Sequence, residues 1–261
     1  MRSARDIARC ASPIAAIVIA FGGCGSRPLD AIAIDPSGLT RDLVAHWSFD
    51  ETSGITASDS SGNGHDGLVT GGTWTSAGRF GGALTLSSGA FVSVANFPQA
   101  AASWTVSLWT RSSAASLETN TTDFSTIISN ENQYSGGWEI HLDNRLSYER
   151  FDAAYWAGRT MDDFVRVFCR CIQPDRWIHL TTVWDSDVTN TVTFFVDGRA
   201  VDQALMPGRI LTGDSTLHIG TWNQGGRFFT GDVDDFAIWS RALAPPEIET
   251  LARQSPGDRF E

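Results

Sequence analysis

Three residues that could do acid–base chemistry alternate within one short segment, Trp138–Asp143, as Glu139, His141 and Asp143. On a β-strand, the two apolar residues between them would enter a core, and the three polar side chains would share the opposite face. Retaining hydrolysis of a glycosidic bond needs two carboxyl groups about 5–5.5 Å apart. Same-face neighbours on a strand are about 6.6 Å apart, so Glu139 and Asp143 would be separated by roughly twice that distance. The spacing therefore favours a solvated polar face without enzymatic activity, and catalysis is the minority alternative.

A second group of polar residues lies in the loop 59–65, which reads Asp-Ser-Ser-Gly-Asn-Gly-His. Calcium takes carboxylate, amide and carbonyl oxygens, and glycine lets a short loop turn its carbonyls toward one centre. The expected calcium ligands in this loop are Asp59, Asn63 and the backbone carbonyl of His65. The alternative is that Asp59 and Asn63 form ordinary Asx turns.

Asp234 is the expected partner of that loop near the other end of the chain. It shares its strand parity with Phe236 and Ile238, so its carboxylate would point toward the core, where an unpaired charge is costly. A structural calcium ion between the loop and this strand would satisfy it, with Asp50 as a further candidate ligand. The alternative is an ion pair between Asp234 and an arginine such as Arg241.

Two polar, glycine-containing segments, 152–159 and 220–227, carry aromatic rings that the core does not require. Rings of this kind stack on sugars or anchor protein interfaces, and loops often carry function. Polar side chains beside them would hydrogen-bond to sugar hydroxyls. The predicted ligand-binding residues are Tyr155, Trp156, Arg159, Trp222, Asn223 and Arg227. The alternative is that the rings only cover the rim of the fold.

Cys169 and Cys171 are the two cysteines of the expected domain. An oxidising compartment would favour a disulfide between them. Residues two apart on a strand have Cα atoms near the upper limit of disulfide reach. The sequence therefore leaves bond and no bond equally open.

The elements that must position these residues are short alternating runs separated by Gly, Asn, Asp and Ser, with almost no helical periodicity. This pattern predicts an all-β fold, an antiparallel two-sheet β-sandwich, in a single domain over residues 41–253 with a tail at 254–261. Asp197 and Gly198 predict a hairpin turn. One short C-terminal helix is expected from Pro245, because proline suits a first helical turn.

Several ordered segments carry a family resemblance, among them LVAHWSFDETSG at 43–54 and GDVDDFAIWSRAL at 231–243. With the segments 78–84, 104–109 and 175–198, the chain resembles laminin G-like, concanavalin A-like jelly-roll domains of exported bacterial proteins. The resemblance covers about residues 41–253 and implies a jelly roll that often carries calcium in the loop matching 59–65. The chain departs from the acidic strand of similar glycoside hydrolases by placing His141 where a second carboxylate is expected. Such domains have many roles, so the resemblance does not identify a ligand.

The N-terminal residues resemble an export signal. Three arginines precede an apolar run that ends at Phe21, and the following Gly-Gly-Cys24 resembles a lipoprotein processing site. We expect a signal peptide at 1–23, lipid attached to Cys24, and a flexible tether at 24–40. The protein would then be an outer-membrane or cell-surface lipoprotein with a periplasmic or extracellular domain. Ordinary cleavage that leaves Cys24 unmodified is the alternative.

The charge of the chain narrows the range of partners. Residues 1–23 hold three Arg and one Asp, so without them the net charge falls from −11 to −13. Nucleic acid is therefore an unsuitable partner, whereas calcium suits an acidic surface. All 19 basic residues are arginine, so there is no lysine nucleophile. The sequence predicts a non-catalytic, monomeric recognition module that binds a glycan, with adhesion to a cell-surface protein as the alternative.

Overall fold

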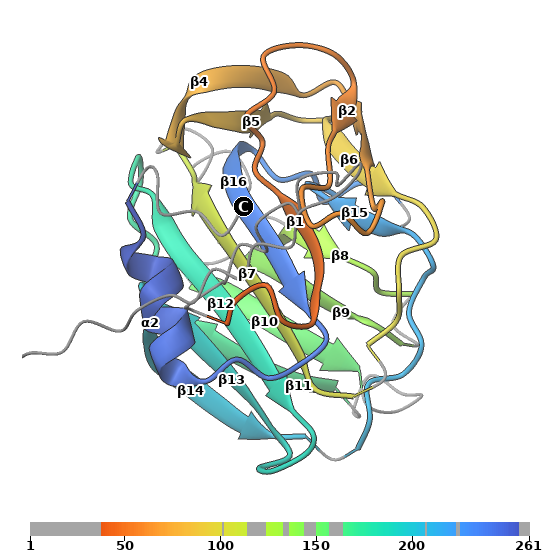
Figure 1. The fold of residues 1–261 in the computed structure, drawn as a ribbon, viewed down its shortest axis with the longest axis vertical. Coiled ribbons are helices and arrows are strands. Elements are labelled where there is room, and N and C mark those ends of the chain that lie inside the picture. Colours follow the sequence, from red (N-terminus) through yellow and green to blue (C-terminus); the bar gives the residue numbers. More distant parts are fainter. Residues whose placement is uncertain are drawn as a thin grey trace, which may run out of the picture. The chain divides into compact units, whose positions relative to one another are not determined.

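The computed structural model describes residues 38–100, 102–113, 124–132, 136–143, 150–156, 164–206, 208–222 and 225–255, without the side chains of residues 150 and 156. Two antiparallel sheets pack face to face, and one helix, α2 (Pro245–Arg253), follows the last strand (Figure 1). The predicted all-β jelly-roll sandwich with one short C-terminal helix is confirmed. Among the described residues, no helix is both long enough and apolar enough to cross a bilayer.

The first sheet, here called sheet A, has eight strands. Seven of them follow the order β14-β13-β12-β7-β16-β5-β4, and β1 also pairs with β16. The strands are β1 (Leu43–Trp47), β4 (Thr73–Phe80), β5 (Gly82–Leu86), β7 (Trp104–Arg111), β12 (Ile178–Asp185), β13 (Thr191–Val196), β14 (Arg199–Leu205) and β16 (Gly231–Trp239). Asp197 and Gly198 join β13 to β14 with φ angles of 47° and 79°, as a tight hairpin turn requires.

The second sheet, sheet B, also has eight strands, in the order β11-β10-β9-β8-β15-β6-β3-β2. They are β2 (Thr56–Ala57), β3 (Gly67–Thr70), β6 (Phe91–Val94), β8 (Phe124–Ser129), β9 (Trp138–Asp143), β10 (Arg150–Trp156), β11 (Phe164–Cys169) and β15 (Leu217–Ile219). All pairings within this sheet are antiparallel.

The main core lies between the two sheets. Alternate residues of each strand enter it, for example Val106 and Leu108 from β7 and Ile140 and Leu142 from β9. The residues between them point to the outer faces of the sandwich. Each sheet therefore presents one outer face on which polar side chains can gather.

A smaller apolar cluster covers part of the outer face of sheet A, where α2 lies beside β12, β13 and β14 (Figure 1). Ile248 and Leu251 of the helix pack there with Phe195 and Trp239. Arg241, just before the helix, binds Glu247 with two hydrogen bonds of 2.9 and 2.7 Å. Apolar contacts thus fix the helix to sheet A, and the Arg241–Glu247 pair fixes it to the segment that follows β16.

The structure joins Cys169 and Cys171 in a disulfide, with their Cα atoms 5.2 Å apart. Cys169 ends β11, and its side chain lies in the main core. The bond closes a very short loop at the edge of sheet B. Its position indicates a structural role.

Candidate functional site

The outer face of sheet B carries the alternating polar residues of β9. The core residues of that strand alternate with Glu139, His141 and Asp143, which therefore share the outer face, as the strand pattern predicted. The strand register sets Asp152 of β10 opposite His141 and Phe124 of β8 opposite Asp143. Paired residues of neighbouring antiparallel strands lie on the same face. These five side chains therefore form one group.

His141 is the centre of a buried charged cluster on this face. Its Nδ1 lies 3.1 Å from Oε1 of Glu139, and its Nε2 lies 3.4 Å from Oδ2 of Asp152. The same Asp152 oxygen lies 3.6 Å from Nε of Arg166. Burial opposes a charge on His141, but the negative charges of Glu139 and Asp152 outweigh it and raise the pKa of His141. The geometry favours an imidazolium held between two carboxylates.

The prediction that this face is solvated is wrong. Glu139, His141, Asp143 and Asp152 are all buried, because they carry opposite charges that can be removed from water together. Both nitrogens of His141 face carboxylates, so neither is positioned to take a proton from a substrate. This arrangement suits a structural ion cluster better than a general base.

A layer of alternating aromatic rings and guanidinium groups lies along the same face. The guanidinium of Arg227 is 4.7 Å from the ring centre of Trp222 and 5.2 Å from that of Phe124. The guanidinium of Arg166 is 5.8 Å from the ring centre of Phe124 and 5.2 Å from that of Phe164. All five side chains are half-buried, so part of each reaches solvent. We call these five residues the stacked layer.

Hydrogen bonds hold the segment that supplies Trp222 and Arg227. The indole Nε1 of Trp222 donates to Oε2 of Glu131. The backbone amide of Thr126 in β8 donates to the carbonyl of Arg227, at 2.7 Å. The segment is thereby attached to the side of β8, and the side chains of Trp222 and Arg227 are held over the sheet.

The structure places the predicted ligand-binding residues in different surroundings. Trp222 and Arg227 lie together in the stacked layer. The prediction for Tyr155 is wrong, because strand alternation turns this residue into the core, where its hydroxyl bonds Thr182 and burial raises its pKa. The side chain of Trp156, and the whole of Arg159 and Asn223, lie outside the described residues.

Three members of the stacked layer were not predicted from the sequence: Phe124, Phe164 and Arg166. In β11, Phe164 and Arg166 alternate with the core residues Val165 and Val167. This period of two is visible in the sequence and could have identified them. No comparable signal marks Phe124, whose position depends on the register between β8 and β9.

The loop 59–65 is organised by Asp59. Its carboxylate accepts hydrogen bonds from the backbone amides of His46, Ser61 and His65, at 3.0, 2.9 and 2.9 Å. Burial raises the pKa of Asp59, but the side-chain hydrogen bond with Ser61 and these three amide bonds outweigh it, so the pKa is lowered. The carbonyl of His65 accepts a hydrogen bond from the indole of Trp47, at 2.9 Å. The bond from Ser61 is the Asx turn that was the alternative to calcium.

Asn63 and Asp50, two further calcium candidates, are also engaged in hydrogen bonds. The amide of Asn63 donates to the carbonyls of Leu43 and Val44. Oδ1 of Asp50 accepts the amide of Gly82, at 2.6 Å. Within the described part of the chain, no group of three or more His, Cys, Asp or Glu side chains is arranged to hold a metal ion.

The predicted orientation of Asp234 is wrong. A register shift between Asp234 and Ala237 adds a residue to β16, so Asp234 lies opposite Trp109 on the outer face of sheet A while Val233 and Phe236 enter the core. Its Oδ2 accepts the backbone amide of Phe80, at 2.9 Å. The alternative partner, Arg241, binds Glu247 instead.

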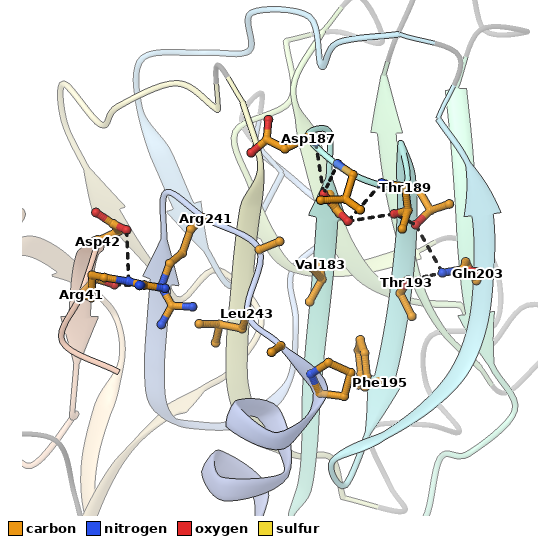
Figure 2. Close-up of a pocket in the computed structure, with 16 residues that line it drawn as sticks. Arg41, Asp42, Val183, Asp187, Thr189, Thr193, Phe195, Gln203, Arg241 and Leu243 are labelled. Carbon is orange, nitrogen blue, oxygen red and sulfur yellow. Dashed lines mark hydrogen bonds and ion pairs between the residues drawn. The ribbon is translucent and has the colours of Figure 1, made fainter. Parts of the chain in front are cut away.

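A groove of about 500 Å³ lies on the outer face of sheet A, beside the segment that leads into α2. Figure 2 shows Arg241 and Leu243 on one side, Thr193 and Gln203 on the other, and Val183 between them. The amide of Gln203 donates to the hydroxyl of Thr193, at 2.8 Å. The groove thus has apolar residues between its two sides, and the rest of its lining includes hydroxyl and amide groups together with charged aspartate and arginine side chains.

Comparisons with known proteins agree with this architecture. A sequence model of the concanavalin A-like lectin/glucanases superfamily matches residues 86–249. The binding domain of Paraclostridial Mosquitocidal Protein 1 superposes with a TM-score of 0.66 and 16% identity, over 82% of this chain and 52% of that one. The botulinum neurotoxin serotype D binding domain gives a TM-score of 0.62 and 14% identity, over 82% and 52% of the two chains.

The receptor binding domain of botulinum neurotoxin type G is also similar, with a TM-score of 0.60 and 16% identity, over 81% of this chain and 51% of that one. The chain spans about half the length of each of these three structures. At such low identity, the likeness shows a shared fold.

Proposed function

The chain belongs to the concanavalin A-like lectin/glucanases superfamily, and from this premise we propose that it is a non-catalytic recognition module that binds carbohydrate on the outer face of sheet B. The observation that carries the proposal is the stacked layer. Its rings offer flat apolar surfaces, and its guanidinium groups offer hydrogen-bond donors in fixed positions. Aromatic surface with a few placed polar groups is typical of a small-molecule site.

The buried cluster beneath the layer supports a binding role over a catalytic one. Glu139 and Asp152 are committed to His141, and Asp152 also faces Arg166. Ion pairs of this kind fix the positions of side chains, which preorganises the surface above them. Preorganisation lowers the entropy cost of binding.

A glycan array with the purified protein tests the proposal. We expect specific binding that weakens at least about tenfold in Trp222→Ala and in Arg227→Ala, because central aromatic and arginine residues carry much of the free energy of binding. Trp177→Ala is the matched control. Its ring stacks with Arg111 at 4.7 Å, the same separation as in the Trp222–Arg227 pair, but at the end of strands in sheet A. An equal loss in the control variant would contradict the assignment of the site.

Adhesion to another protein is the second candidate function, and the groove in Figure 2 favours it. Val188 beside the groove is 86% exposed, and Leu205 at the end of β14 is 75% exposed. Exposed apolar side chains beside a groove mark surfaces for protein contact. A blank glycan array from folded protein would favour this candidate over carbohydrate.

Calcium binding also stays a proposal, supported by the acidic charge and by the oxygens that Asp59, Asn63 and His65 bring into one loop. If an ion holds this loop against β1, we expect a chelator to lower the melting temperature by several degrees, as a loss of about 1–2 kcal/mol gives in a domain of this size. Differential scanning calorimetry with calcium and then with chelator measures this change. Identical melting curves would exclude a stabilising ion.

Export and lipid attachment at Cys24 remain predictions, because residues 1–37 lie outside the described residues. We propose display as a monomeric domain on the outer membrane or cell surface through this lipid. The mass of the mature protein checks the proposal, since diacylglycerol on Cys24 adds a fixed increment.

A further inference from the structure

A second cavity, of about 370 Å³, lies on sheet A beside β4 and β5, away from the stacked layer. Its walls come from the segment after β1, which supplies Asp50 and Glu51, and from β4, which supplies Trp74. The turn between β4 and β5 closes one side. Gly81 is needed in this turn, because its φ is 78° and a Cβ there would lie 2.6 Å from Oδ1 of Asp50.

The lining of this cavity is negatively charged. It contains two carboxylates, and no arginine or histidine is among its residues. Oε1 of Glu51 accepts the backbone amide of Ser58, at 2.7 Å. The Glu51 carboxylate is thereby held in place, and together with Asp50 it makes the cavity attractive to a cation.

Trp74 provides an aromatic wall in a fixed orientation. Its Nε1 donates to the carbonyl of Gly54, at 2.9 Å, and its ring centre lies 6.5 Å from that of Phe49. The ring is half-buried. An organic cation is attracted to the face of an indole, and an alkyl chain packs well against it. A bare metal ion would make no use of this wall.

We propose that this cavity binds an alkylammonium group, such as the end of a lysine side chain or a free amine. The ammonium would lie against the carboxylates of Asp50 and Glu51 that line the cavity, and its methylene groups would lie against Trp74. A compact head group with three donors suits a site with two carboxylates. The chain contains no lysine, so a lysine side chain would come from a different protein and not from a second copy of this one.

The test is isothermal titration calorimetry of the full chain with n-butylammonium chloride, in about 0.15 M salt to screen nonspecific attraction. We expect saturable binding that weakens by about tenfold or more in Glu51→Gln, because hydrogen bonds to charged groups are about twice as strong as neutral ones. The substitution keeps an oxygen that can accept the amide of Ser58. Glu249→Gln, on the exposed side of α2, removes the same charge elsewhere and should bind as the wild type does.

Further variants and ligands test which side chain and which part of the ligand are responsible for binding. Trp74→Leu should also weaken binding, while Trp74→Phe, which keeps a ring, should retain most of it. N-acetyl-lysine amide should bind like n-butylammonium, whereas n-butanol should not bind. Equal affinity in Glu51→Gln and Glu249→Gln would overturn the proposal, as would binding of n-butanol. Saturation by calcium chloride but not by the amine would assign the cavity to the metal ion instead.

Discussion

Replacing Asp152 with alanine is expected to lower the free energy of unfolding by about 3–5 kcal/mol, because removing one partner leaves the other buried charges uncompensated. Asp152 is fully buried, and one of its oxygens faces both His141 and Arg166, at 3.4 and 3.6 Å. Without Asp152, Nε2 of His141 and Nε of Arg166 would both lose the carboxylate that they face. Denaturant unfolding followed by tryptophan fluorescence measures the loss.

The exposed ion pair between Glu249 and Arg253 on α2 provides the control. Its atoms are 2.6 Å apart, closer than those of the buried cluster, but the side chains are 51% and 74% exposed. Exposed pairs contribute about 0–1 kcal/mol, so Glu249→Ala should change stability little. In Asp152→Asn, NMR titration should show a lower pKa for His141, since one of the two charges that raise it is gone. A loss below about 1 kcal/mol in Asp152→Ala would contradict the ion cluster.

The fold could be predicted from the sequence because its signals are local. The period of two in β9 and β11, the Asp197-Gly198 turn and the proline at the start of α2 each follow from a few neighbouring residues. Family segments near both ends of the domain added the jelly-roll type of the sandwich. These signals agree with one another, which is why the two-sheet architecture could be recognised.

The candidate site was less predictable, because it depends on strand register and on single-residue irregularities. Tyr155 was predicted to bind a ligand, and only the register of β10 shows that it enters the core. The orientation of Asp234 was predicted by counting along the strand, and one bulge in β16 reversed it. The stacked layer joins residues from β8, β11 and the 220–227 segment, which are distant in sequence. No local pattern encodes their proximity.

His179 is the group expected to have the largest effect on stability at mildly acidic pH. It is fully buried on the outer face of sheet A, where its Nε2 lies 2.8 Å from the hydroxyl of Ser107 and its ring centre lies 5.0 Å from that of Trp109. Burial lowers the pKa of His179 to about 4, although the charge of Asp235 acts in the opposite direction and that of Arg79 adds to the lowering. The folded protein therefore holds this imidazole in its neutral form.

The direction of the pH effect follows from proton linkage. Between pH 6.5 and about 4, the unfolded chain binds a proton at His179 and the folded chain does not, so stability falls as the pH falls through this range. The loss amounts to about 3 kcal/mol, or roughly 6–12 °C in melting temperature for a domain of this size. The contribution of His141 has the opposite sign, because its raised pKa stabilises the fold at low pH.

Comparison of the wild type with His179→Gln isolates the contribution of this one residue. Glutamine keeps a polar contact for Ser107 but does not titrate, so the variant should lose about 3 kcal/mol less than the wild type between pH 6.5 and 4. His218→Gln is the matched control. Burial also lowers the pKa of His218, but this residue is only partly buried, so its effect should be smaller. If the free energy of unfolding changes with pH by the same amount in the wild type and in His179→Gln, then His179 is protonated equally in the folded and unfolded states.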